Sequence, residues 1–186
     1  MRYWIINKEN FIIKKENSLP LGIKFINNKN FLLILPRTDI FRPVPHIWYE
    51  DLFDEQVKEF QAILDNLNYN FLINLNIKEH PKNINRSVSF KNFLNTNSST
   101  KYVNINLPFQ NICENHSLII FSYLSTEFFK QLSLNKPCVL FINKKYFNNF
   151  INKDCKQDFS ELHNAGIFFT DAKKLSNKIN LYANNL

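Results

Sequence analysis

Short apolar runs alternate along the chain with polar turns and with longer amphipathic stretches. Runs of about five apolar residues, bounded by turn residues or proline, are typical of buried strands. The stretch Asn70–Lys78 instead alternates apolar and polar residues, which predicts one strand with a single apolar face. Trp4–Ile6 and Phe11–Ile13 are weaker candidates for short strands. We expect the six strands of the sheet within the runs that begin at Phe31, Phe71, Tyr102, Leu118, Cys138 and Ile167.

The stretches between these runs predict helices. Glu50–Leu67 has apolar residues with a period near 3.6 and acidic residues in its first turns, as expected of an amphipathic helix. Glu127–Leu134 is a shorter helix that Asn135 ends and Lys136-Pro137 breaks. Further helical segments are expected at 88–94, 109–114, 144–154 and 159–164, and from Thr170 or Asp171 towards Tyr182.

The order of the elements predicts the fold class. In Asn115–Asn143 an apolar run, a helix and a second apolar run follow one another, which is the pattern of a parallel crossover. The same alternation continues from Phe31 to the end of the chain. It predicts an α/β fold with a doubly wound, Rossmann-like parallel sheet in the order 3-2-1-4-5-6 with right-handed crossovers. We expect one domain over residues 31–186, preceded by residues 1–30 as a remnant or linker.

The net charge of the chain indicates which kinds of binding partner to expect. The 186 residues carry a formal net charge of +7, and the pI is about 9.3. This charge favours anionic partners such as nucleotides, phosphorylated substrates or an acidic membrane surface. The lysines are scattered and no nucleic-acid-binding motif occurs, so no nucleic-acid partner is expected. A solvated basic surface is the alternative interpretation for most of these lysines.

The spacing of the cysteines, histidines and apolar residues indicates whether the chain binds metal and in which compartment the protein lies. The three cysteines form no CxxC pair and the four histidines have no metal-binding spacing, so we expect reduced thiols and no metal site. The apolar stretches are too short to span a membrane. Asn7-Lys8-Glu9 interrupts the N-terminal apolar run too early for a signal peptide. These patterns predict a cytoplasmic protein, with peripheral contact at the inner membrane face left open.

Two polar turns directly follow predicted strands, at Lys78–Pro81 and at Ser122–Thr126. Hydroxyl and N–H groups at the start of a helix bind phosphate, but Ser and Thr also serve there as plain helix caps. Because both turns follow parallel strands, they should lie on one rim of the sheet, and this convergence favours an anion site. Arg37 and Arg42 follow another strand and are either ligand contacts or residues of a solvated loop.

These motifs also occur in a known order. A basic-x-His-Pro motif, Lys78–Pro81, precedes a serine-rich turn, a helix and a Lys-Pro pair, Ser122–Pro137. Leu33–Pro43 matches the start of such a domain, and Ala165–Phe169 matches its last strand. Over about residues 31–182 the chain resembles the C-terminal half of GT-B glycosyltransferases. More closely, it resembles bacterial surface-carbohydrate transferases related to the CDP-glycerol glycerophosphotransferases of teichoic acid synthesis.

The resemblance implies a function and a site. The domain would bind a CDP-, UDP- or GDP-linked donor and serve a transferase of surface polysaccharide synthesis that passes on a sugar or a polyol phosphate. His80 would be the catalytic candidate, and Arg37 and Arg42 would contact the donor from their loop. No metal and no cofactor besides the donor is implied. The candidate phosphate-binding residues are Lys78, His80, Ser122, Ser125 and Thr126.

Two features depart from the family pattern. Lys130 stands where the family often has an acidic residue in the helix. A GT-B enzyme also needs an N-terminal half with acceptor contacts, and residues 1–30 are too short for it. Two hypotheses follow: a donor-binding transferase domain that is inactive without a separate acceptor half, or a truncated, non-catalytic module that binds a nucleotide sugar or a partner.

Overall fold

The computed structural model describes residues 30–36, 50–79, 92–93, 95–97, 101–103 and 107–184. The candidate strands at Trp4–Ile6 and Phe11–Ile13 lie outside the described residues, and so does most of the helix expected at 88–94. The domain boundary at residue 31 therefore stays a prediction.

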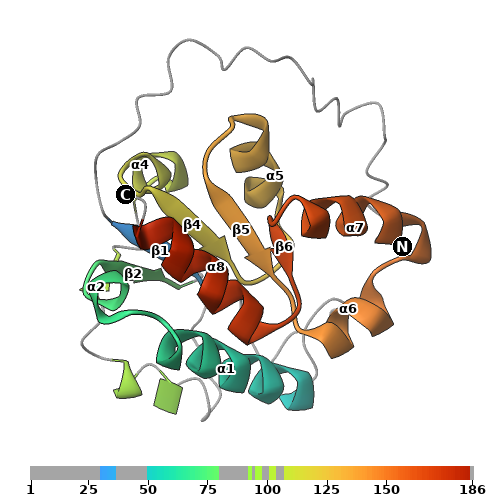
Figure 1. Ribbon diagram of the computed structural model, residues 1–186, viewed down its shortest axis with the longest axis horizontal. Coiled ribbons are helices and arrows are strands. Elements are labelled where there is room, and N and C mark those ends of the chain that lie inside the picture. The colour runs from blue at the N-terminus through green and yellow to red at the C-terminus, as the bar shows by residue number, and fades with distance from the viewer. Residues whose placement is uncertain are drawn as a thin grey trace.

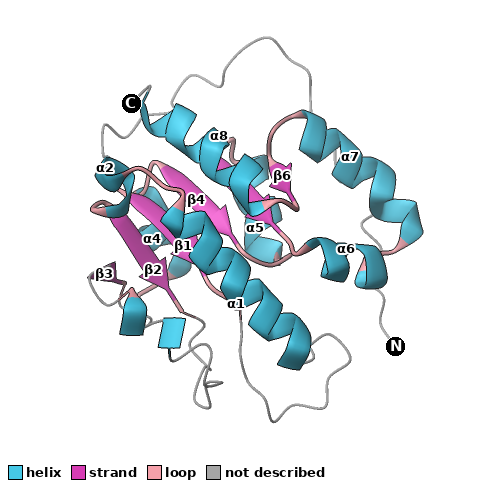
Figure 2. Cartoon of the chain, turned by 60° about the horizontal axis from the view of Figure 1, so that its bottom comes forward, coloured by secondary structure: helices cyan, strands magenta, loops and turns pink. Residues whose placement is uncertain are grey.

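Six parallel strands form one sheet in the order β3-β2-β1-β4-β5-β6 (Figures 1 and 2). Every pairing is parallel, so the predicted doubly wound sheet and its strand order are confirmed. In the register, Ile34 lies level with both Lys78 and Phe121, which brings three strand ends to one rim. The strands are β1 (Phe31–Ile34), β2 (Leu75–Lys78), β3 (Lys101–Tyr102), β4 (Leu118–Phe121), β5 (Cys138–Phe141) and β6 (Phe168–Phe169).

Helices cover both faces of the sheet (Figure 2). α1, α2 and α8 contribute to one apolar core, and α4, α5 and α7 contribute to the other. Leu33 of β1 belongs to the first core and Leu32 to the second, which explains why the strand is apolar at every position. The helices are α1 (Glu50–Asp65), α2 (Tyr69–Leu72), α4 (Phe109–Glu114), α5 (Thr126–Ser133), α6 (Lys144–Phe150), α7 (Lys156–Asn164) and α8 (Ala172–Asn184), with a 3-10 turn at Lys153–Cys155.

The prediction of one long strand over Asn70–Lys78 is wrong. The chain first forms the short helix α2 and enters the sheet only at Leu75. In this helix Phe71 is buried and stacks on Phe31 with ring centroids 3.8 Å apart, while Ile73 is half exposed. The alternating pattern fails because one helical turn, rather than a strand, places Phe71 and Leu75 inward.

Two helices end in the same hydrogen-bonded motif before a strand begins. After α5, Asn135 has φ 52°, its N–H donates to Leu132 O, and the N–H of Lys136 donates to Gln131 O. After α7, Gly166 has φ 71°, and its N–H donates to His163 O. The N–H of Ile167 donates to Leu162 O. This is the Schellman arrangement, which satisfies the last carbonyls of a helix through a left-handed residue. Both predicted helix ends are confirmed.

A histidine joins β2 to α4 at the amino-terminal side of the sheet. His116 Nδ1 lies 2.6 Å from Ile112 O, so this nitrogen carries the proton and donates it. Nε2 therefore accepts from Asn76 Nδ2, 3.0 Å away. Burial lowers the pKa of His116 below its ordinary value, because the charged ring is poorly solvated there.

The left-handed backbone conformation of Gly166 predicts that replacing this glycine lowers the stability of the protein. Gly166→Ala should lower the free energy of unfolding by about 1 kcal/mol, because an L-residue disfavours this backbone conformation. An added Cβ would meet only the flexible Lys178 side chain, at 3.3 Å, so backbone strain should dominate. Asn135→Gly is the matched control and should be neutral or slightly stabilising. Urea denaturation measures both, and an unchanged Gly166→Ala protein would contradict the assigned geometry.

The neutral His116 ring predicts a pH dependence. Because the folded pKa lies below the ordinary 6.5, the unfolded state binds more protons as the pH falls. The free energy of unfolding should therefore be fully retained above about pH 6.5 and should fall below it. Urea titrations at about pH 7.5 and about pH 5.5 should show this loss, and His116→Gln should reduce it. The exposed His163 is the control: a larger effect of His163→Gln would refute the assignment.

Candidate functional site

A cavity of about 300 Å³ opens at the rim formed by the carboxyl ends of β1, β2 and β4. The strand order reverses between β1 and β4, and ligands of open α/β sheets bind at such switch points. Aromatic side chains and a few charged ones form its walls. The lining residues are Ile34, Leu35, Lys78, Glu79, Leu107, Phe109, Phe121, Tyr123, Ser125 and Glu127.

Lys78 is the cation of this cavity. It is the last residue of β2 and only 6% exposed. Within the part of the chain that the structure describes, its ammonium group makes no hydrogen bond or ion pair. Burial lowers the pKa of Lys78, since the charged form loses solvation there. An ammonium group that has lost part of its solvation and has no partner among the described residues attracts an anion.

Ser125 lies in the same cavity as Lys78 and begins the helix α5. Its backbone is extended, and its Oγ accepts a hydrogen bond from the N–H of Phe128 at 3.2 Å. The hydroxyl thus serves as the helix cap, and Ser125 is one of the residues that line the cavity. The neighbouring Thr126 is exposed and is not part of the lining.

Ser122 is used inside the protein to hold two strand ends together. It is fully buried, and both its N–H and its hydroxyl donate to Ile34 O. These bonds join the end of β4 to the end of β1 at the floor of the rim. Of the predicted phosphate-binding residues, the structure therefore brings together Lys78 and Ser125. His80, Arg37 and Arg42 lie outside the described residues.

Several lining residues escaped the sequence analysis. Glu127 lines the cavity, and one of its carboxylate oxygens, Oε2, is buried without a hydrogen-bond partner within the described residues. Phe109 and Tyr123 supply aromatic walls, and burial raises the pKa of the Tyr123 hydroxyl. An acidic residue two positions after a helix cap is the only local signal for Glu127. Nothing local identifies Phe109, which reaches the cavity from α4.

A buried amide on α1 ties the rim together behind the cavity. Gln56 is fully buried; its Nε2 donates to Ser122 O, and its Oε1 accepts from the N–H of Asn143, each at 3.3 Å. The Asn143 side chain in turn donates to Glu59 Oε2 at 2.9 Å and caps α6. Burial raises the pKa of Glu59. The loops after β4 and β5 are thereby held in one relative position.

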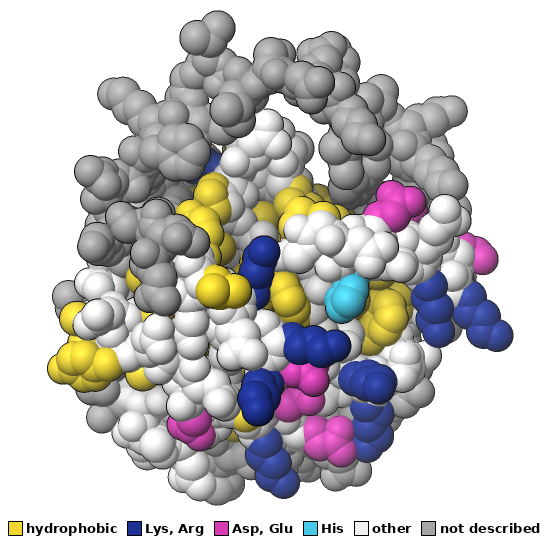
Figure 3. All heavy atoms as spheres, viewed as in Figure 1, with side chains coloured by type: hydrophobic (Ala, Val, Ile, Leu, Met, Phe, Trp, Pro, Cys, Tyr) yellow, Lys and Arg dark blue, Asp and Glu magenta, His cyan; other side chains and the backbone are white. Residues whose placement is uncertain are grey.

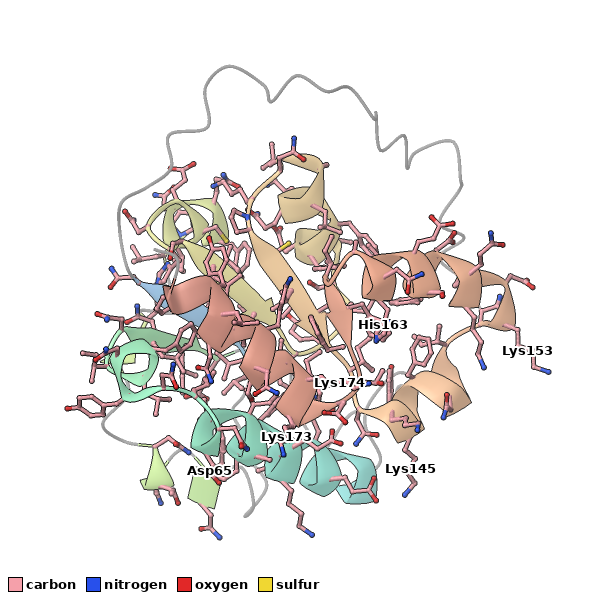
Figure 4. All side chains as sticks on the ribbon, in the orientation of Figure 1. Asp65, Lys145, Lys153, His163, Lys173 and Lys174 are labelled. Carbon is pink, nitrogen blue, oxygen red and sulfur yellow. The ribbon has the colours of Figure 1, made fainter. Side chains whose placement is uncertain are left out.

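A second, more open hollow of about 440 Å³ lies beside this network. Glu55, Glu59, Asn143, Lys144, Lys145 and Asn148 line it. Lys145, labelled in Figure 4, pairs with Glu55 at 3.0 Å. Because Glu59 and Asn143 are also bonded to each other, this hollow is a weaker candidate for a ligand site.

In the described part of the chain we also searched for metal-binding groups, reactive thiols and membrane-spanning helices. No group of three or more His, Cys, Asp or Glu residues there could hold a metal ion. All three cysteines are free, and burial raises the pKa of Cys113 and of Cys138 to about 12, so both stay thiols. Among the described helices, none is both long enough and apolar enough to cross a bilayer.

Comparison with known proteins assigns the chain to one protein family. The family model described as a LIC12162 family transferase matches residues 21–186, which include every described element. No curated protein and no solved structure gives a significant match.

The Gln56 bridge predicts a large loss of stability on substitution. Gln56→Leu keeps the side-chain volume but leaves Ser122 O and the N–H of Asn143 without partners. Each such buried group costs about 1–3 kcal/mol, so we expect the free energy of unfolding to fall by about 2–4 kcal/mol. The exposed Gln157→Leu is the control and should change stability by less than about 0.5 kcal/mol. Equal effects of the two substitutions in urea denaturation would show that the bridge is unimportant.

Proposed function

Because the chain belongs to the LIC12162 family of transferases, we propose that its rim cavity binds the phosphates of a nucleotide-activated donor. The observation that carries this proposal is the buried, unpaired Lys78 beside the start of α5. An anion there would pair with the partly desolvated ammonium group through charge-assisted hydrogen bonds.

The start of α5 supplies further donors. Ser125 satisfies the N–H of Phe128, but helix geometry provides no intrahelical acceptor for the N–H groups of Thr126 and Glu127. The helix dipole also favours an anion at this end. Lys78 and the helix start together therefore suit a phosphate or diphosphate better than a neutral ligand.

The sequence that follows β1 and β2 is rich in positive charge, which favours an anionic partner. Residues 37–49 and 80–91 follow β1 and β2 in the chain. They contain five basic residues, Arg37, Arg42, Lys82, Arg86 and Lys91, against the single acidic residue Asp39. By contrast, Figure 3 shows lysines interspersed with acidic side chains on the face that carries α1 and α8.

The finer proposal is a GT-B-type donor domain in bacterial surface-polysaccharide synthesis. The run Leu118–Pro137 supports it, because it forms a strand and a serine-capped helix that ends before Lys136-Pro137, in the order that the resemblance implies. The reaction would be displacement at a sugar carbon or a glycerophosphoryl phosphorus, with the nucleotide as leaving group. Lys78 and the N–H groups of α5 would stabilise the negative charge that develops on that leaving group. The leaving nucleotide would be CDP, UDP or GDP for attack at a sugar carbon, and CMP for attack at the glycerophosphoryl phosphorus of a CDP-linked donor.

A non-catalytic binding module is the second candidate. Lys130, where the family often has an acidic residue, is exposed on α5 and does not line the cavity. A single domain also offers only one wall of a cleft, whereas positioning of two reactants can supply roughly 7–11 kcal/mol of a barrier. We therefore propose that this domain by itself binds the donor without measurable transfer, and that transfer requires a second wall that holds the acceptor.

Nucleotide titration tests the proposal. We expect calorimetry to show micromolar to millimolar binding of CDP, UDP or GDP. Lys78→Met should weaken it about 10–100-fold, the value of one charge-assisted hydrogen bond of roughly 1.5–3 kcal/mol. The substitution should not lower stability, because it removes an unpaired charge that burial has partly desolvated.

The exposed Lys58 on α1 provides the control. Lys58→Met removes the same charge from the protein but should leave binding nearly unchanged. Absence of heat with all three nucleotides, or equal affinities for the Lys78 and Lys58 variants, would refute a phosphate site at this rim.

A further inference from the structure

A fully buried amide on α5 is left unpaired outside the rim cavity. Gln131 is 0% exposed, and neither its Nε2 nor its Oε1 atom has a hydrogen-bond partner within the described residues. Gln131 does not line the rim cavity. Buried side-chain amides usually find partners, as the equally buried Gln56 does with both of its amide atoms. Gln131 therefore offers donor hydrogens and an acceptor that the described part of the protein does not use.

The turn after α5 brings a cation to this amide. The N–H of Lys136 donates to Gln131 O at 3.0 Å, so the two residues adjoin where the chain turns towards β5. The Nζ atom of Lys136 is buried, and it too has no hydrogen-bond partner within the described residues. Other atoms of Lys136 are partly exposed, which places this pair of residues close to the surface.

The charges around Cys113 show which way the Lys136 ammonium group lies. Cys113 is on α4, which covers the same face of the sheet as α5 (Figure 2). Burial raises the pKa of this thiol to about 12, and among the surrounding charges Lys136 opposes the rise most strongly. Lys130 and Lys78 also oppose it, whereas Glu127 adds to it. The ammonium group thus lies in the seam between α4 and α5, where positive charges outnumber negative ones.

We propose that Gln131 and Lys136 bind a small oxyanion that keeps one proton, such as bicarbonate or hydrogenphosphate, in this seam. The hydroxyl of such an ion donates to Oε1 of the amide while a second oxygen accepts from Nε2, and a remaining oxygen accepts from the ammonium group. Nitrate, sulfate or chloride would leave Oε1 without a donor, and Lys136 would repel a metal cation. The site is distinct from the rim cavity and does not depend on the transferase function.

Two matched pairs of anions test whether the proton is required. Bicarbonate and nitrate are both planar monoanions, while hydrogenphosphate and sulfate are both tetrahedral dianions; only the first member of each pair carries a proton. Urea denaturation of the full chain near pH 8, at rising concentrations of each sodium salt, gives the dissociation constants, because an anion that binds the folded state raises the free energy of unfolding. We expect the protonated member to bind about tenfold more tightly. A preference in the planar pair identifies bicarbonate, and one in the tetrahedral pair identifies hydrogenphosphate.

Variants assign the preference to this seam and remove general salt effects. Lys136→Met and Gln131→Leu should each abolish it. In chloride buffer Gln131→Leu should be no less stable than the unsubstituted protein, because it removes an unpaired buried amide. Lys130→Met removes the same charge from the exposed side of α5 and should keep the preference. Lys78→Met should keep it too, since Lys78 belongs to the rim cavity.

Several results would overturn the proposal. One is the absence of a preference in both pairs, and another is a preference that survives Lys136→Met or Gln131→Leu. Equal binding of bicarbonate and nitrate that depends on Lys136 would indicate a site for charge alone. A preference lost in Lys78→Met would place the ion at the rim, and a less stable Gln131→Leu protein in chloride would show that the amide is already paired. Nucleotide binding is measured separately, so failure here leaves the proposed function untouched.

Discussion

The position of β1 between β2 and β4 is the constraint on which the candidate site depends. Parallel pairing on both sides brings the ends of three strands to one rim, with Ile34 level with Lys78 and Phe121. At this switch point the chain departs from neighbouring strands in opposite directions, which leaves a gap that a ligand can fill. The hydrogen bonds from Ser122 to Ile34 O close the floor of that gap.

Stability and binding are divided between two neighbouring parts of this rim. Behind the cavity, Gln56 and Asn143 form a buried network in which both side chains have partners. At the cavity, the buried Lys78 side chain and the buried Oε2 atom of Glu127 lack partners among the described residues. Unpaired buried charges reduce stability, so their presence beside a satisfied network is typical of a binding site. The aromatic walls strengthen any charge-assisted bond formed there.

Much of the fold could be predicted because its signals are local. The ends of α5 and α7 and the start of α8 depend on hydrogen bonds within a few residues, through Asn135, Gly166 and Asp171. Uninterrupted apolar runs indicated strands covered on both faces, and their alternation with helices indicated the strand order. The segment 70–78 was mispredicted because its conformation follows from the stacking of Phe71 on Phe31, a contact between distant parts of the chain.

By itself the sequence determined the α/β class, the strand order and the rim on which Lys78 and Ser125 meet, since parallel strands with known ends leave little choice. Only the tertiary structure decided which polar groups face the cavity and which are used inside the protein. Ser122 became a tie between strands, while Glu127 was left with a buried, unpaired oxygen. The physical reason is that a polar group finds its hydrogen-bond partners on β1, β2, α1 and α4. The separation of these elements along the chain does not tell how far apart they lie in space.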